Sequence, residues 1–180
     1  MPTATETIRV AADAEDYQAF GEIIAAYVGW CRERYRDEAM LVDRVFGHQA
    51  LTTELADLTA VYGPPRGRTL LAWAGEEVCG GGAYRRLPDG SCEMKRLFVH
   101  DRFRGRGVGR RLCAALIEAA RADGFELMRL DTGDRMTEAI GMYASFGFVE
   151  AAPHHVYPDD LRPYMVFMEL PLVGTANNEA

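Results

Sequence analysis

A turn rich in glycine and arginine at positions 104–109 has the residue types of a phosphate-binding loop. Glycine stands at positions 105, 107 and 109, and glycine allows backbone N–H groups to converge on an anion. A helical apolar pattern begins directly after the turn, and a helix start adds unpaired amides and a positive dipole end. From Lys95 to Arg111, seven basic residues and one acidic residue give a local charge of +6 (7 − 1), whereas the whole chain carries −7. The turn therefore predicts a polyanionic ligand.

The spacing within this turn excludes two common nucleotide-binding motifs. A G-x-G-x-x-G turn would need glycine where Arg110 stands, and a Walker A loop needs Gly-Lys-Ser/Thr, whereas Lys95 is the only lysine of the chain. The pattern that is present is Arg104-x-x-Gly107-x-Gly109. It resembles the acyl-CoA pyrophosphate loop of the GCN5-related N-acetyltransferase (GNAT) family, which lies between a central strand and a helix.

Two further blocks resemble the same family and stand in the same order. Residues 139–148 read A-I-G-M-Y-A-S-F-G-F, which is similar to the family's A-I-x-L-Y-x-x-x-G-F with Met142 in place of leucine. Glu93 lies eleven residues (104 − 93) before Arg104, where histone-type members carry their general base. The resemblance extends over roughly residues 8–170, and the chain is identified as a member of this family.

The elements needed to position these blocks are strands that alternate with helices. The sequence predicts helices at 13–35, 37–62 with a break near Gly47, from the glycine turn to Gly124, and at 136–146, and it predicts strands at 7–11, 69–74, 78–87, 91–99, 127–132, 149–151 and 164–170. This order predicts an α/β (α+β) fold with a mixed, mostly antiparallel sheet of six to seven strands and helices on both faces. It matches the acyl-CoA N-acyltransferase fold that the resemblance implies. We expect one domain over residues 7–171 and flexible termini at 1–6 and 172–180.

The resemblance implies direct transfer of an acetyl group from acetyl-CoA to a primary amine in a ternary complex. Glu93 is the candidate general base, provided that partial burial raises its pKa from about 4.3 toward neutrality. Its alternative role is that of a strand carboxylate paired with Lys95 or Arg96. Tyr143 is the candidate acid for the departing thiolate, because a phenol with a pKa near 10 suits a thiol leaving group. The alternative for Tyr143 is a core aromatic residue.

The coenzyme site is expected at the junction of the 91–99 strand and the glycine turn. The resemblance implies that the pantetheine arm lies between the 91–99 and 127–132 strands, and that a backbone N–H of Leu97 or Phe98 stabilises the oxyanion. The expected coenzyme-binding residues are Leu97, Phe98, Val99, Arg104, Gly105, Arg106, Gly107, Val108, Gly109 and Arg110. No metal is expected, because adjacent side chains such as His154 and His155 normally point apart.

The acceptor site follows less directly from the sequence. The resemblance places it between the first helix, the loop after that helix and the segment before the last strand. The candidate acceptor-binding residues there are Trp30, Arg32, Tyr35, His155 and Tyr157. The aromatic and proline-rich segment 153–163 is expected to close the cleft, which favours a small amine or amino-acid-like acceptor. The choice of base between Glu93 and a loop histidine stays open.

Two other functions compete with a small-molecule N-acetyltransferase. One is a protein or peptide N-acetyltransferase, which would need an open peptide groove. The other is a non-catalytic sensor that binds acyl-CoA without turnover, and the presence of both Glu93 and Tyr143 disfavours it. A serine hydrolase is excluded because neither Ser91 nor Ser145 lies in a G-x-S-x-G motif.

The composition of the chain excludes several further classes. A pI near 5.1 argues against a nucleic-acid partner. No apolar run has the length of a membrane span and the first ten residues lack the pattern of a signal peptide, so no membrane partner and a cytoplasmic location are expected. The four cysteines show no C-x-x-C spacing and are expected to be buried thiols. A homodimer is one assembly compatible with the family resemblance.

Overall fold

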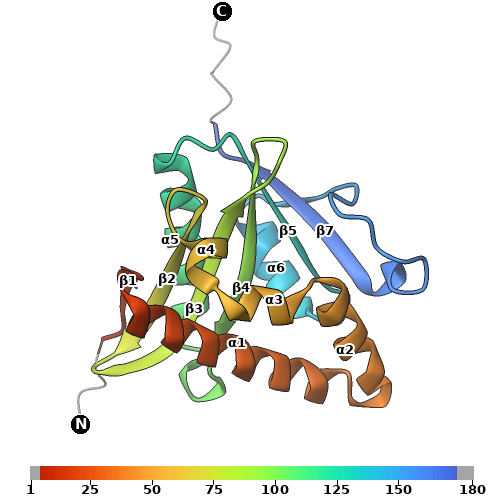
Figure 1. Ribbon diagram of the computed structural model, residues 1–180, viewed down its shortest axis with the longest axis horizontal. Helices are drawn as coiled ribbons and strands as arrows, with labels where there is room; N and C mark the ends of the chain where they lie inside the picture. Colours follow the sequence, from red (N-terminus) through yellow and green to blue (C-terminus); the bar gives the residue numbers. More distant parts are fainter. Residues whose placement is uncertain (1–4, 174–180) are drawn as a thin grey trace, which may run out of the picture.

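The computed structural model describes residues 5–173, and seven strands form one sheet in the order β1-β2-β3-β4-β5-β7-β6 (Figure 1). Neighbouring strands run antiparallel except β4 and β5, which are parallel. The strands are β1 (Thr7–Val10), β2 (Gly67–Ala74), β3 (Glu77–Arg86), β4 (Cys92–Val99), β5 (Leu127–Gly133), β6 (Val149–Glu150) and β7 (Met165–Pro171). The predicted mixed, mostly antiparallel sheet is confirmed.

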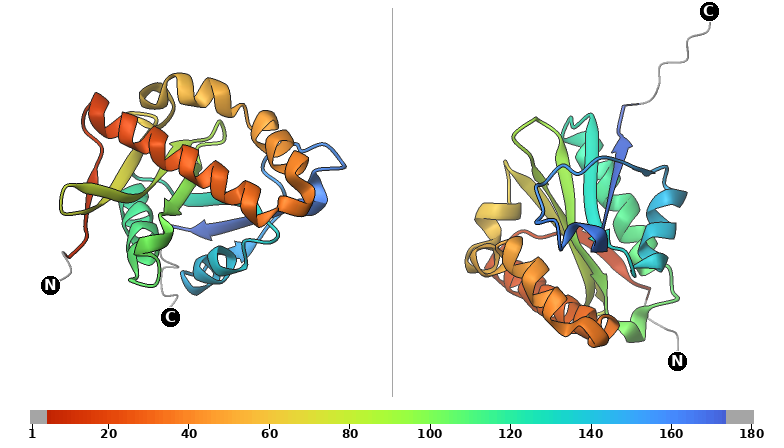
Figure 2. Two further views of the ribbon diagram at one scale, coloured as in Figure 1. Left: turned by 90° about the horizontal axis from the view of Figure 1, so that it is seen from below. Right: turned by 90° about the vertical axis from the view of Figure 1, so that its right-hand side faces the viewer.

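Helices cover both faces of this sheet, as Figure 2 shows. One hydrophobic core lies between the sheet and the helices α1 (Ala14–Arg34), α2 (Ala39–His48), α3 (Leu51–Ala56) and α4 (Leu58–Tyr62). The other core lies between the opposite face and the helices α5 (Val108–Ala122) and α6 (Thr137–Ser145). Single 3-10 turns occur at Arg36–Glu38, Asp101–Phe103 and Arg162–Tyr164. The α/β prediction with helices on both faces is therefore confirmed.

The first helix forms where its sequence predicts. The Asp13 side chain accepts a hydrogen bond from the Asp16 amide at 2.9 Å and so caps the helix start. Phe20, Ile23 and Ile24 recur at helical spacing and are almost completely buried. Each such side chain contributes about 1.5–3 kcal/mol when it leaves water. The cap and the apolar stripe together fix which face of α1 meets the sheet.

The second helical region breaks within three residues (50 − 47) of Gly47, close to the expected position. Gly47 lies inside α2, and the chain turns at Ala50, whose φ is 55°. Long-range contacts explain the position of the break, because the side chain of Gln49 bonds to Tyr157 and that of Glu54 bonds to Arg96. Such contacts override a single glycine inside a helix.

An irregular region in β4 opens the centre of the sheet. The register of β3 and β4 changes between the pairs Gly81↔Phe98 and Ala83↔Lys95, so two residues of β4 face one residue of β3. Arg96 in this bulge has a φ of 59°. The parallel strands β4 and β5 pair only at Cys92↔Met128 and Glu93↔Arg129. Beyond these pairs the two strands separate, and the cleft described below begins in that gap.

The expected flexible termini lie partly outside the described residues, namely at 1–4 and 174–180. Within the described part, the Glu6 carboxylate pairs with Arg111 at 2.8 Å and Leu172 belongs to the core under α5. Across residues 5–173, none of the helices combines the length and the apolar character that crossing a membrane would require.

Candidate active site

An open groove of about 530 Å³ lies between β4, α5 and α6. Gly107 precedes α5 at its mouth with a φ of 75°, and no side chain caps this helix. The first amides of α5 therefore stay available to an anion in the groove. Nine of the ten residues expected at the coenzyme line it: Leu97, Phe98, Val99, Arg104, Gly105, Gly107, Val108, Gly109 and Arg110.

Arg106 is the expected coenzyme residue that does not line the groove. Its guanidinium lies 3.7 Å from the Glu6 carboxylate and 5.3 Å from the centre of the Phe103 ring. This ion pair and ring contact hold the side chain on the outer side of the turn. Arg106 therefore lies outside the groove in this structure, and its role toward the coenzyme stays a prediction.

Two other arginines of the turn are held within the groove by contacts of their own. Arg104 Nε donates to the carbonyl oxygen of Val99 at 3.1 Å, and its guanidinium lies 4.4 Å from the Trp30 ring centre. Arg110 Nη1 donates to the Ser145 hydroxyl at 2.7 Å. Both guanidinium groups keep further donors for a phosphate oxygen.

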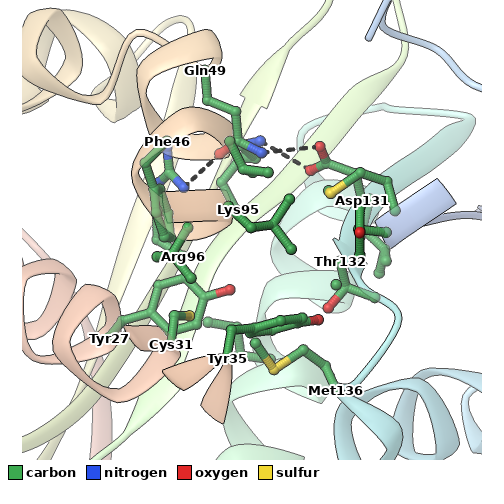
Figure 3. A pocket seen from close by; sticks show the side chains of 18 of the residues that line it. Tyr27, Cys31, Tyr35, Phe46, Gln49, Lys95, Arg96, Asp131, Thr132 and Met136 are labelled. Carbon is green, nitrogen blue, oxygen red and sulfur yellow. Dashed lines mark hydrogen bonds and ion pairs between the residues drawn. The ribbon is translucent and has the colours of Figure 1, made fainter. Parts of the chain in front are cut away.

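A second cavity, of about 80 Å³, adjoins the groove between α1, α2, β4, β5 and β7 (Figure 3). We call it the acceptor pocket, for the role that we propose for it. Tyr27, Tyr35 and Phe46 form aromatic walls, and Cys31 and Met136 lie beside them. The residues that line both this pocket and the groove are Tyr27, Leu97, Thr132, Met136 and Tyr143. A thioester in the groove and a ligand in the pocket would thus meet at the end of β4.

Paired charges form the polar wall of the acceptor pocket. Lys95 Nζ lies 3.0 Å from Asp131 Oδ1, and both side chains are almost fully buried, at 4% and 2% exposure. The Tyr157 hydroxyl donates to Asp131 Oδ2 at 2.5 Å, and Gln49 Nε2 donates to the same oxygen at 3.2 Å. Burial acts to raise the pKa of Asp131, but the charge of Lys95 and the hydrogen bonds from Tyr157 and Lys95 together hold the pKa below its usual value. Asp131 is therefore ionised at neutral pH.

A second ion pair lies deeper in the same wall. Arg96 donates from Nε and Nη2 to both oxygens of Glu54, each at 2.8 Å, and from Nη1 to Gln49 Oε1 at 2.8 Å. Such bidentate geometry is the strongest form of this interaction. The bulge of β4 at Arg96 accompanies the contact of this side chain with Glu54 of α3. The same irregularity of the strand therefore helps to form this wall of the pocket.

Tyr143 lies where the groove and the acceptor pocket meet. Burial raises its pKa above the ordinary value, with smaller effects of Cys113 and Asp131 in the same direction. The phenol consequently stays protonated and can donate a hydrogen bond. The raised pKa also makes it a weaker acid than an ordinary tyrosine, whose pKa is near 10.

Glu93 differs most from its expected state. Its side chain is completely buried, lines neither the groove nor the acceptor pocket, and lies 2.9 Å from Arg85 Nη2. Lys95 Nζ is 3.5 Å away, and the Nε2 atoms of His154 and His155 lie 3.1 and 2.6 Å from Oε1. Burial acts to raise the pKa of Glu93, but Lys95, the two histidines and Arg85 together hold the pKa far below its usual range. The expectation of a raised pKa is wrong, while the pairing with Lys95 is confirmed.

The two adjacent histidines do not point apart, contrary to expectation. Their rings lie 4.5 Å apart, and both approach the same oxygen of Glu93. The three side chains have the donor types of a metal site, with ligand atoms within 4.8 Å of one another. However, Arg85 and Lys95 already contact the carboxylate, and their positive charges oppose a divalent cation. These residues therefore fit a hydrogen-bonded charge cluster better than a metal centre.

The expected acceptor-binding residues divide between several places. Tyr35 lines the acceptor pocket. Tyr157 does not line it, but its hydroxyl donates to Asp131, which does. Trp30 lines the coenzyme groove instead. Arg32 is exposed and donates to Asp43 at 2.7 Å, so an ion pair on the helix surface holds it away from the pocket. His155 lies on Glu93, outside both cavities, because the loop folds back over β4.

Several polar residues of the pocket were absent from the candidates predicted from the sequence, among them Gln49, Lys95 and Asp131. A signal was present for Lys95 and Asp131, because both are charged residues within predicted strands of the sheet, and buried charges are paired or functional. Gln49 carried no such signal, since its role depends on the turn at Ala50.

Comparison with known proteins agrees with this arrangement. Residues 26–148, which are 123 (148 − 26 + 1) of the 180, match the Acetyltransferase (GNAT) family. An uncharacterized N-acetyltransferase of Schizosaccharomyces pombe is 36% identical over 68% of this chain and 74% of its own length. An IAA acetyltransferase of Azospirillum brasilense is 35% identical over 73% of this chain and 86% of its own length. A Dictyostelium discoideum N-acetyltransferase is 46% identical over 38% of this chain, and the match spans only 32% of that relative.

Solved structures show the same fold. A Klebsiella pneumoniae structure named as an acyl-CoA N-acyltransferase has a TM-score of 0.70 and 29% identity, and covers 94% of this chain and 99% of that chain. A Salmonella typhimurium acetyltransferase, solved with its cofactor acetyl-CoA, has a TM-score of 0.62 and 23% identity over 97% and 98% of the two chains. The family match over more than half of the sequence, the relatives and the fold agree with the glycine turn and its groove. The chain therefore belongs to the GNAT family of acetyl-CoA-dependent N-acetyltransferases.

Proposed function

We propose that the protein transfers the acetyl group of acetyl-CoA to the primary amine of a small, amine- or amino-acid-like molecule, in a ternary complex. The observation that carries the proposal is the meeting of the two cavities at Leu97, Thr132 and Tyr143. An acyl group that reaches along the groove would end beside a pocket lined by aromatic rings and one ionised carboxylate. Holding both reactants in this way removes much of the entropic barrier to their reaction.

The size of the acceptor is inferred from the cover of the pocket. The segment between β6 and β7 is held to α2 by an ion pair of Arg44 with Asp160 and by His48 Nε2, 2.7 Å from the carbonyl oxygen of Val156. Tyr164 and Met165, at the end of this segment, line the pocket. A pocket of about 80 Å³ with such a cover favours a small molecule over a peptide chain.

The proposed reaction gives each group one task. The amine lone pair attacks the thioester carbonyl, and a backbone N–H of Leu97 or Phe98 donates to the oxyanion. The C–S bond then breaks, and the Tyr143 hydroxyl donates to the departing thiolate. We assign the proton released by the amine to Asp131, because it is the carboxylate that lines the pocket. Glu93 then acts as a positioning residue, because it holds Lys95 against Asp131.

Free-thiol release from acetyl-CoA tests this proposal directly. The panel would contain small primary amines, amino acids, IAA as named for one relative, and short peptides with a free N-terminus or lysine. We expect release with one class of small amine and none with the peptides. Release with peptides alone would favour a protein N-acetyltransferase, and tight acetyl-CoA binding without release from any acceptor would favour the sensor. A homodimer and a cytoplasmic location stay predictions.

A further inference from the structure

A third cavity, of about 590 Å³, lies on the other side of Glu93 from the acceptor pocket. We call it the basic cavity. It opens beside the β3–β4 hairpin and the start of β5, and it shares no lining residue with the groove or the acceptor pocket. Its basic and titratable lining consists of Arg66, Arg85, Arg86, Arg129, His154 and His155.

The charge of this cavity is strongly positive for an acidic protein. Four arginines and the single acidic lining residue, Asp89, give +3 (4 − 1) with neutral histidines, whereas the whole chain carries −7. Asp89 is occupied by Arg129 and by Ser91, whose amide and hydroxyl donate to it at 3.0 and 2.6 Å. Glu169 adds one weaker contact to Arg129, at 3.8 Å. The negative charges around the cavity therefore compensate only part of the positive charge.

Two of the four arginines lack an ionic partner. Within residues 5–173, no acidic group lies within ion-pair distance of Arg66 or Arg86, and the guanidinium of Arg86 lies 4.4 Å from the Phe125 ring centre. Arg85 directs Nε and Nη2 to one oxygen of Glu93, so its third nitrogen, Nη1, is not used on this carboxylate. Several guanidinium donors thus converge on one open cavity without an acceptor for each of them.

We propose that the basic cavity binds the carboxylate or phosphate group of a small molecule, at a site separate from the coenzyme groove. Guanidinium groups present planar pairs of N–H donors that match such oxyanions. His154 and His155 each keep a ring nitrogen, Nδ1, that is not used on Glu93. This inference does not depend on the identity of the acetyl acceptor.

Glu93 connects the basic cavity with the acceptor pocket through a chain of side-chain contacts. It contacts Arg85, His154 and His155 on one side and Lys95 on the other, and Lys95 in turn contacts Asp131. An anion that draws Arg85 or the histidines toward itself weakens their hold on Glu93. Arg85 should not be replaced in a test, because its removal would also take a partner from a buried carboxylate.

The test titrates inorganic phosphate and, separately, acetate into the full chain with the coenzyme groove filled by CoA. Imidazole NMR signals report the site, since the chain has only four histidines, and His100, which does not line the basic cavity, serves as the internal reference. We expect saturable shifts of His154 and His155 with at least one anion. The anion that produces them identifies the chemistry as phosphate or carboxylate.

Substitutions of two exposed arginines test whether the basic cavity is the anion site. The exposed pair Arg66→Gln and Arg86→Gln should weaken the anion affinity by at least about tenfold, which corresponds to about 1.4 kcal/mol. Arg36→Gln, at an exposed arginine that lines none of the three cavities, should leave the affinity unchanged. The proposal is overturned if neither anion gives saturable shifts, or if the double variant binds as tightly as the wild type. Saturable shifts with zinc chloride and with neither anion would also overturn it and would assign the histidines to a metal.

Discussion

The coenzyme groove and the acceptor pocket meet at Tyr143 but are built from different parts of the chain. The groove takes more than half of its lining residues from one continuous stretch, residues 97–110, and offers backbone amides at a glycine turn. The pocket takes its polar wall from side chains far apart in sequence, Gln49, Lys95 and Asp131, which hold one another in place. A backbone site is encoded locally, whereas a side-chain site depends on the whole fold. Coenzyme binding should therefore tolerate surface substitutions that acceptor binding does not.

The largest effect is expected from breaking the buried pair in the acceptor pocket. Asp131→Asn leaves the buried charge of Lys95 with Glu93 at 3.5 Å as its remaining carboxylate partner. We expect a loss of about 3–5 kcal/mol in the free energy of unfolding, measured with urea. Asp159→Asn, at an exposed position of the same segment as Tyr157, is the matched control and should change it by less than about 0.5 kcal/mol. Equal stabilities of the two variants would contradict the role given to the pair.

The second largest effect is a loss of acetyl-CoA affinity when the glycine turn of the groove is changed. Gly107→Val places a β-branched side chain at a φ of 75° beside the free amides of α5, which costs about 1–3 kcal/mol. Acetyl-CoA affinity in calorimetry should fall by about tenfold to a hundredfold. Gly109→Ala is the control, because its Cβ would meet only Val99 Cγ2, at 3.7 Å. Similar losses in both variants would show that the turn needs no left-handed glycine.

A smaller effect is expected where the two cavities meet. Tyr143→Phe keeps the ring and removes the hydroxyl that should donate to the thiolate. We expect turnover to fall by at least about tenfold, or about 1.4 kcal/mol, with an acetyl-CoA affinity within a factor of about two of the wild type, since the loss concerns only the transition state. Unchanged turnover would refute the assignment of Tyr143 as donor.

The smallest effect is a pH dependence of stability caused by Glu93. Its pKa in the folded protein lies below the value in the unfolded chain, about 4.3. The stabilisation is therefore complete above the unfolded pKa and is lost as the pH falls below about 5 toward the folded pKa. The unfolding free energy of Glu93→Gln should fall less steeply from pH 5 to pH 3 than that of the wild type. Equal slopes would mean that the pKa of Glu93 is not lowered in the folded protein.

Sequence reasoning succeeded where structure is local and failed where distant segments meet. The glycine turn, the cap at Asp13 and the start of α5 depend on neighbouring residues, so their pattern predicted them. The cluster of Glu93 with His154 and His155 depends on a loop that returns across β4 from about sixty positions away. Spacing along the chain could not predict that two adjacent rings meet one carboxylate, nor that the resulting pKa falls instead of rising.

The proposed function requires that the acceptor occupies the pocket while acetyl-CoA occupies the groove. Val42→Phe tests it, because Val42 lines the acceptor pocket and not the groove; Val149→Phe, at an exposed position of β6, is the control. The measurement is the KM for the best amine of the panel, together with the Kd for acetyl-CoA. We predict a KM raised by at least about tenfold, the equivalent of about 1.4 kcal/mol, and an unchanged Kd. An unchanged KM, or equal losses in both constants, would contradict the account.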